Sequence, residues 1–280
     1  MGYIYTGCRE LTLSDKEIEE FYKDRASISR QCAGLYQNQY LILKNENGEP
    51  FFYGRCDNEK IVEIQFPVIK SNYGTIKPRN PEQYCAIDLL KSRDIKVKVI
   101  RGVYGSGKDF LMLFEALSLI EKEAFQKIIY VRPPVTVANV PDIGFLPGDM
   151  VQKLYWTLGP IYDKVGGDAG IQCLIQQEKL EIAPLNYIRG RSFDNSIVYM
   201  SEGQNSTTEI MKLLLGRIGE GSELWINADT HQVDKKVFEA DNGITRMVNV
   251  LRGNPLFGYI YLPTTERSEV ARLADLLDEI

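Results

Sequence analysis

The chain carries the stretch RGVYGSGKD at residues 101–109. An alternating apolar run at residues 95–100 precedes it and predicts a strand, and the apolar residues 110–117 that follow predict a helix. Glycines let backbone N–H groups approach a phosphate closely, and the first turn of a helix adds unpaired N–H groups and a partial positive charge. A strand, a glycine-rich turn, Gly-Lys and a helix in this order predict a phosphate-binding P-loop.

This loop predicts a site for a nucleoside triphosphate. The Gly-x4-Gly-Lys pattern is complete, and Lys108 is in the position from which the lysine of such a loop reaches the terminal phosphates. The pattern departs at its last position, where Asp109 replaces the Ser or Thr whose hydroxyl binds Mg²⁺. A strand-to-helix turn with an incidental lysine is the alternative. The predicted nucleotide-binding residues of the loop are Gly102, Val103, Tyr104, Gly105, Ser106, Gly107, Lys108 and Asp109.

Strands and helices alternate from Lys96 onward, which predicts an α/β fold with a mostly parallel sheet covered by helices on both faces. Ligands then bind at the carboxyl ends of the strands. We expect residues 133–149 to form an excursion from the sheet and residues 181–192 to lie outside the core. The further predicted strands are 127–131, 196–200, 223–227 and 258–262, and the predicted helices are 207–215, 243–251 and 266–277.

A smaller region is predicted before this domain. Ser14 and Glu17 form a capping box, so a helix should run from about Asp15 to Ser27. Strands are predicted at 39–44, 51–55 and 61–66, with an Asn-Gly turn between the first two. The expected organisation is therefore a helix and β-meander in residues 1–73, a linker over residues 71–78, and a main domain in residues 74–280.

Composition limits the function classes. The net charge of −5 disfavours broad nucleic-acid binding through bulk charge, so such a contact would need a local patch or a ring pore. The five cysteines include no CxxC pair, which fits a reducing cytoplasm, and the single histidine, His231, excludes a His-rich metal site. No apolar run approaches the ~18–20 residues of a membrane span, and no signal peptide is recognised at the start. We expect a cytoplasmic protein with no membrane partner.

The position of Gln83 allows two interpretations, a helix cap and a contact with adenine. Asn80 and Pro81 suit the cap and first position of a predicted helix that runs to about Lys91. As the third helical residue, Gln83 can complete a capping-box pair with Asn80. Gln83 also precedes the P-loop closely, where its amide could read both N6–H and N7 of adenine.

Acidic residues follow two predicted strands. A nucleoside triphosphatase needs Mg²⁺, a polarised water and a charge sensor. Glu202 follows the strand that ends at Met200 and fits a general base, whereas Ser201 stands where a metal-binding Asp is expected. Asp229 and Gln232 follow the next strand and could orient water or sense the γ-phosphate. The alternatives are a solvated carboxylate at Glu202 and an Asx-turn at Asp229.

Several arginines are candidates for binding phosphate. Arg217 follows a predicted helix, where a cation also suits the helix C-terminus, so both interpretations stay open. Arg267 lies in the first turn of the last predicted helix, where a cation opposes the dipole, and this makes it the better candidate. Arg189 and Arg191 could hold a phosphate of nucleotide or nucleic acid, or simply be solvated.

Together these motifs resemble the PhoH family of bacterial and phage P-loop ATPases, which is related to superfamily 1 helicases. The resemblance runs from about Gly74 to the C-terminus and is similar to the ATPase half of members that carry an N-terminal PIN ribonuclease domain. The N-terminal region here is too short for that nuclease, so we expect no PIN activity. The matching segments are 76–83, 131–134, 143–149, 187–192, 204–205, 216–219, 229, 232–234, 242–243 and 266–269.

The resemblance implies a superfamily 1 helicase-like core that binds ATP and Mg²⁺ through Gln83 and the P-loop, with Arg132 among the nucleotide-binding residues. It also implies a homo-hexameric ring and work linked to single-stranded RNA. Within such a ring, Arg217 or Arg267 would act on the γ-phosphate of a neighbouring subunit.

The sequence departs from the family pattern at two positions, and both affect the Mg²⁺ site. The family P-loop ends Gly-Lys-Thr where this chain has Asp109, and the family motif Asp-Glu-Ala-Gln-Asn begins here with Ser201. One hypothesis is an exchanged metal site in which Asp109 ligates Mg²⁺ and Ser201 supports it; the rival is independent loss of both residues. The leading function is an ATPase coupling turnover to a conformational or RNA-linked step. A nucleotide-binding scaffold with little hydrolysis and a chain that binds no nucleotide are the alternatives.

Overall fold

The computed structural model describes residues 5–23, 34–65, 67–133, 158–229 and 242–266. Its main sheet has six strands, all parallel, in the order β12-β7-β11-β10-β8-β9. This confirms the predicted α/β class. The strands are β7 (Val97–Gly102), β8 (Lys127–Arg132), β9 (Leu180–Pro184), β10 (Ser196–Met200), β11 (Glu223–Asp229) and β12 (Phe257–Leu262).

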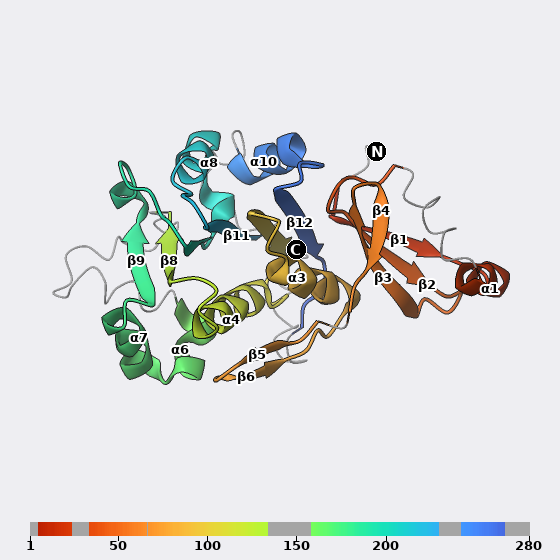
Figure 1. Cartoon of the computed structure of the whole chain (residues 1–280), viewed down its shortest axis with the longest axis horizontal. Helices are drawn as coiled ribbons and strands as arrows, with labels where there is room; N and C mark the ends of the chain where they lie inside the picture. Colours follow the sequence, from red (N-terminus) through yellow and green to blue (C-terminus); the bar gives the residue numbers. More distant parts are fainter. Residues whose placement is uncertain (1–4, 24–33, 66, 134–157, 230–241, 267–280) are drawn as a thin grey trace, which may run out of the picture.

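Helices cover both faces of this sheet (Figure 1). Every residue of β10 and β11 is buried, as expected for central parallel strands that are covered on both sides. Tyr199 packs into the core beneath α4, while Met200 packs with α8 and α10 on the other face. The first face carries α3 (Pro81–Lys91), α4 (Lys108–Glu121), α6 (Gly159–Val165) and α7 (Gly167–Gln176); the second carries α8 (Thr208–Leu215) and α10 (Gly243–Leu251).

The strand order brings the predicted chemistry together. β7 lies between β12 and β11, and β11 lies beside β10. Asp229 pairs in register with Gly102, and Met200 pairs with Ile226. The P-loop after β7, Glu202 after β10 and Asp229 at the end of β11 therefore meet at the carboxyl edge of one sheet.

The N-terminal region forms a second sheet of four strands in the order β1-β2-β3-β4, with α1 (Asp15–Lys23) beside it. One half of the expected capping box is present, because the Ser14 backbone N–H donates to the Glu17 carboxylate at 2.8 Å; the Ser14 hydroxyl donates to the same carboxylate at 2.7 Å. The parallel pairing of β1 with β2 was not predicted. The strands are β1 (Cys8–Thr12), β2 (Tyr40–Lys44), β3 (Pro50–Asp57) and β4 (Lys60–Glu63).

This small sheet packs directly against the main domain. The Asn38 amide donates to the carbonyls of Pro255 (2.9 Å) and Phe257 (3.0 Å), and Tyr261 N–H donates to the Thr6 carbonyl (2.9 Å). Tyr40 shares a hydrophobic core with α3 and α4. The two regions predicted from sequence are thus bonded to each other along β12.

Two expectations about loops are wrong. Residues 181–192 were expected outside the core, but β9 pairs with β8 as the edge strand of the main sheet. The expected linker over residues 71–78 is part of a hairpin of β5 (Ile69–Ser71) and β6 (Gly74–Ile76). Ile69 is fully buried, and the Ser118 hydroxyl donates to the Lys70 carbonyl at 2.7 Å, which fixes the hairpin on α4.

Two predicted segments lie outside the described residues. These are the excursion expected over residues 133–149, except for Pro133, and the helix expected over residues 266–277, except for Glu266. Within the described ranges, no helix is long and apolar enough to cross a lipid bilayer.

Candidate nucleotide-binding site

The P-loop joins the end of β7 to the start of α4. Gly105 and Gly107 have φ angles of 75° and 81°, in the left-handed region that glycine adopts without strain. A Cβ at Gly102 would lie 2.7 Å from the Ser106 hydroxyl and 2.9 Å from Leu262, so this position is too crowded for a side chain. The local sequence therefore folds into the glycine-dependent turn that was predicted.

Lys108 is the first residue of α4, and its ammonium group is paired inside the protein. It lies 2.9 Å from the Asp229 carboxylate and donates to the Val103 carbonyl at 3.2 Å. Both Lys108 and Asp229 are buried. A phosphate group that binds this loop has to share the ammonium with Asp229 or draw it away.

Asp109 is turned toward the sheet. One carboxylate oxygen, Oδ1, accepts hydrogen bonds from the Tyr199 hydroxyl at 2.7 Å and from the Asn227 amide. Burial raises the pKa of Asp109, and the hydrogen bond from Tyr199 opposes that shift. Ser201 follows β10 directly and is buried, and its backbone N–H donates to the Val131 carbonyl at 3.0 Å.

Glu202 has an unusual backbone and a well-defined set of partners. Its φ of 57° places a non-glycine residue in the left-handed region. Its carboxylate accepts from the Gln204 amide at 2.6 Å and lies 4.0 Å from the Arg132 guanidinium. The Gln204 side chain in turn accepts from the Asp229 backbone N–H at 2.9 Å. The two acidic strand tips are thus joined by one glutamine.

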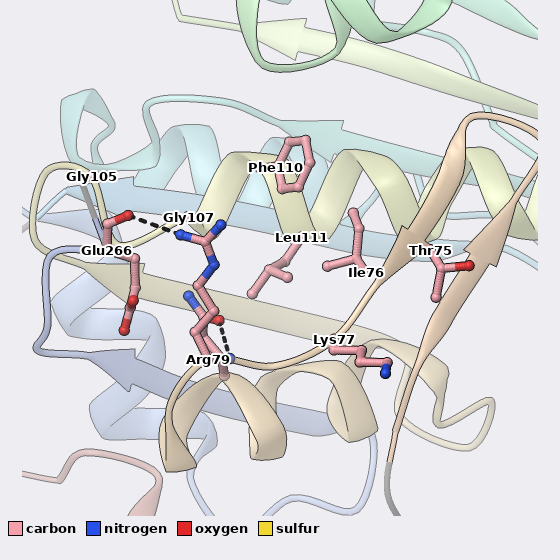
Figure 2. Close-up of a pocket in the computed structure, with 10 residues that line it drawn as sticks. Thr75, Ile76, Lys77, Arg79, Gly105, Gly107, Phe110, Leu111 and Glu266 are labelled. Atoms are coloured by element: carbon pink, nitrogen blue, oxygen red, sulfur yellow. Dashed lines mark hydrogen bonds between the residues drawn. The ribbon is translucent and has the colours of Figure 1, made fainter. Parts of the chain in front are cut away.

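A pocket of about 620 Å³ opens beside the P-loop (Figure 2). Phe110 and Ile76 contribute apolar surface, and Arg79 and Glu266 contribute polar groups. The pocket is lined by Thr75, Ile76, Lys77, Arg79, Gln83, Gly105, Gly107, Phe110, Leu111 and Glu266.

Gln83 lines this pocket and also supports the P-loop. Its amide donates to the Ser106 carbonyl at 3.0 Å and accepts from the Arg79 backbone N–H at 3.0 Å. The expected cap is present, since the Asn80 side chain accepts from the Gln83 backbone N–H at 2.8 Å. An amide has two donors and two acceptor lone pairs, so these two bonds leave one of each unused.

The segment after β12 touches the P-loop from outside. The Thr265 hydroxyl donates to the Tyr104 carbonyl, and the Glu266 backbone N–H donates to the Gly105 carbonyl, both at 3.0 Å. The Glu266 carbonyl accepts from the Arg79 guanidinium at 3.2 Å (Figure 2). These contacts were not predicted, because no local pattern indicates that residue 266 returns to residue 105.

Arg191 in the loop after β9 and Arg217 after α8 are joined by a hydrogen bond. Arg191 pairs with Glu181 at 2.6 Å and lies over the Phe193 ring, and its carbonyl accepts from Arg217 at 3.3 Å. Arg189 is exposed. Within the described part of the chain, none of these arginines has a hydrogen bond to the P-loop. Gln232, His231 and Arg267 lie outside the described residues.

Sequence reasoning missed Asn227, Tyr199 and Gln204, which connect the predicted acids. The available signal was a polar residue within an otherwise buried strand, since Asn227 interrupts the apolar run of β11 and is 2% exposed. A buried amide needs hydrogen-bond partners, so its position alone indicated a network.

Comparison with known proteins finds the same family in the family model and among the relatives. A family model described as "PhoH-like protein" matches residues 75–275. Protein PhoH2 of Bacillus subtilis is 31% identical over 296 residues, which cover 98% of this chain and 64% of that protein. Protein PhoH2 of Mycolicibacterium smegmatis is 31% identical over 281 residues, with 99% and 63% covered. A PhoH-like protein of B. subtilis is 35% identical over 162 residues, with 57% and 49% covered. The chain therefore spans less than two thirds of the length of these relatives.

Proposed function

The chain belongs to the PhoH family, which is of the P-loop nucleotide-binding type, and we propose that it binds ATP and hydrolyses it to drive a conformational or RNA-linked step. The observation that carries this proposal is the arrangement of the P-loop. A glycine-dependent turn places Lys108 at the start of α4, and a pocket of about 620 Å³ lies directly beside it.

The proposed binding mode follows from this layout. The triphosphate lies on the backbone N–H groups of residues 102–109 and on the Lys108 ammonium. The base enters the pocket, where Phe110 and Ile76 offer apolar surface and Gln83 offers one donor and one acceptor. Adenine presents the complementary N7 acceptor and N6–H donor, which is why we propose ATP rather than GTP. Arg132 is placed beside Glu202 and could contact the phosphates.

Asp109 and Ser201 are the residues that we propose to hold Mg²⁺. Mg²⁺ prefers hard oxygen ligands and keeps several waters. The two hydrogen bonds to Asp109 described above both use Oδ1, so Oδ2 is the oxygen proposed for the metal, together with the Ser201 hydroxyl. When bound, Mg²⁺ would neutralise charge on the phosphates.

The remaining proposed roles are those of the general base, the groups that orient water and the charge sensors. Glu202 is proposed as the base that accepts a proton from water, and Asp229 with Gln232 as the groups that orient that water. Arg217 and Arg267 are proposed as charge sensors in a hexameric ring of identical chains, with the γ-phosphate of a neighbour as their target.

A second candidate function is a nucleotide-binding scaffold with little turnover. It is favoured by two observations: Lys108 is already paired with Asp229, and one oxygen of Asp109 is engaged by sheet side chains. Nucleotide could then bind and fix a conformation without being consumed.

Turnover separates the two functions. Phosphate release from ATP should be measured for the full chain with and without Mg²⁺, and with and without single-stranded RNA, beside a Glu202→Gln variant. The ATPase proposal expects Mg²⁺-dependent release that Glu202→Gln lowers by about a hundredfold or more, to a rate that can still be measured, while ATP still binds. Binding without release in any condition would favour the scaffold. Faster release with RNA supports the RNA link, and an unchanged rate opposes it.

A further inference from the structure

Asn227 is a polar residue in the interior of the main sheet. It lies on β11 and is 2% exposed. Burying an amide is unfavourable unless its donors and acceptor are satisfied. Here the Nδ2 group donates to Asp109 Oδ1 and to the Tyr199 hydroxyl (2.8 Å), and Oδ1 accepts from the Glu202 backbone N–H at 2.8 Å.

These bonds join three separate segments of the chain. Asp109 belongs to the start of α4, Asn227 to β11, and Tyr199 and Glu202 to β10 and the loop directly after it. The Tyr199 hydroxyl accepts from Asn227 and donates to Asp109 at 2.7 Å, so the three side chains form a closed set of hydrogen bonds. The P-loop carboxylate is thereby connected to the backbone of the proposed base.

The orientation of the Asn227 amide follows from the charge at Asp109. A carboxylate accepts hydrogen bonds and donates none when ionised, so it must face the NH₂ end of the amide. The oxygen end is then turned toward the Glu202 N–H. The Glu202 N–H selects the same orientation, because it can only donate, and a neutral group at position 109 that could also donate would remove the selection made by Asp109.

Glu202 needs such support because of its backbone. Its φ and ψ of 57° and 41° lie in the left-handed region, which is unfavourable for a residue with a side chain. The Glu202 N–H is bound by Asn227, and its carbonyl accepts from Asn205 N–H at 3.0 Å. The direction in which the Glu202 carboxylate leaves the chain depends on these two bonds.

We propose that Asn227 is a positioning residue that sets the backbone of Glu202 according to the carboxylate at Asp109, with Tyr199 closing the set of hydrogen bonds. The inference rests on the proposed function, because it assigns Glu202 the role of base. It gives Asp109 a second role, in addition to any contact with Mg²⁺.

The first test is independent of turnover. Hydrogen exchange of the peptide that covers residues 200–206 should be followed in the nucleotide-free chain. We expect Asn227→Ala and Asp109→Asn each to increase exchange there by about tenfold, because a hydrogen bond that fixes the segment is lost. Ser206→Ala is the matched control, since its buried hydroxyl has no hydrogen-bond partner among the described residues. Exchange unchanged by Asn227→Ala would overturn the inference.

The second test uses steady-state ATP turnover. Asn227→Ala should lower kcat by about tenfold to a hundredfold with a smaller change in KM, which is within the range that a misplaced general base loses. Combined with Glu202→Gln, it should lower kcat no further. Additive losses would mean that Asn227 does not act through Glu202, and would overturn the inference. If the wild-type chain shows no turnover, the proposed function fails, while the exchange experiment still decides the role of Asn227.

Discussion

Gln83 is the side chain on which the preference for ATP over GTP depends. Gln83 bonds to the P-loop and lines the pocket, and we propose that its remaining donor and acceptor bind adenine. Replacing Gln83 with Ala should weaken ATP binding by about tenfold or more, which corresponds to one or two lost hydrogen bonds. Binding of GTP should weaken less, because only the support of Ser106 is lost. Titrations of both nucleotides against the same protein measure this, and equal losses for ATP and GTP would leave Gln83 with a structural role alone.

The exchanged metal site is tested by a double-mutant cycle at positions 109 and 201. Asp109→Thr should depress the affinity for Mg²⁺-ATP, because no carboxylate then faces the metal. Adding Ser201→Asp should restore it. Affinities measured at several Mg²⁺ concentrations distinguish a metal effect from a general loss of binding. If Asp109→Thr alone strengthens Mg²⁺-ATP binding, Asp109 opposes the nucleotide and is not a ligand.

Much of the site could be predicted from sequence, because its residues are marked by short local patterns. Lys108 follows a strand and a glycine turn, and Glu202 and Asp229 follow strands, so a parallel sheet must bring them to one edge. The partners Tyr199 and Asn227 could not be predicted in the same way. Their contacts depend on which strands are neighbours, and this order is not written in any local pattern.

Secondary-structure elements were predictable where their patterns are strong. β10 (SIVYM) has four apolar residues in a row and β11 (ELWINAD) has three, whereas β9 (LEIAP) contains Glu181 and ends in Pro184, so it gives a weak signal. β9 becomes a strand because β8 offers it a free edge. The hairpin of β5 and β6 similarly depends on its contact with α4.

A buried ion pair joins β7 to β11 at the opposite end of the sheet from the P-loop. Lys98 and Glu223 are fully buried and 2.7 Å apart, and Glu223 also accepts from the Trp225 ring N–H at 2.9 Å. Burial lowers the pKa of Lys98 to about 8, although Glu223 opposes the shift. An unfolded lysine titrates near its ordinary value of 10.5.

This pair predicts a pH dependence of stability. Between pH 8 and about 10 the unfolded chain binds more protons at Lys98 than the folded chain, so this residue makes the free energy of unfolding rise with pH. The wild-type value should rise by about 2 kcal/mol relative to that of Lys98→Met over this range. Urea unfolding at pH 7, 8, 9 and 10 measures the difference. A difference that is constant or falls with pH would contradict it.

The molecule as a whole is expected to unfold as one unit. The small sheet shares a hydrophobic core with α3 and α4, and Asn38 bonds it to the turn before β12. Asn38 has a φ of 63°, so Asn38→Gly retains the backbone conformation while removing the amide. We expect Asn38→Gly to lower the free energy of unfolding by about 1–3 kcal/mol, because the carbonyls of Pro255 and Phe257 lose their donor.

Calorimetry tests this coupling. Both the wild type and Asn38→Gly should show a single transition, at a lower temperature for the variant. Asn58→Gly is a suitable control, because Asn58 also has a positive φ of 48°, and its side chain donates to the adjacent Asp57 at 3.3 Å rather than to the main domain. Two separate transitions in the wild type would show that residues 1–73 and 74–280 fold independently.

Binding of Mg²⁺-ATP at the P-loop is tested most directly by isothermal titration calorimetry of the wild-type chain beside Lys108→Ala. The wild type should bind one nucleotide per chain, and Lys108→Ala should weaken binding by at least about tenfold, because the ammonium that meets the phosphates is lost. Lys127→Ala, at the far end of β8, should leave binding unchanged. A wild-type chain that takes up no nucleotide, or a Lys108→Ala variant that binds as tightly as wild type, would contradict a nucleotide site at this loop.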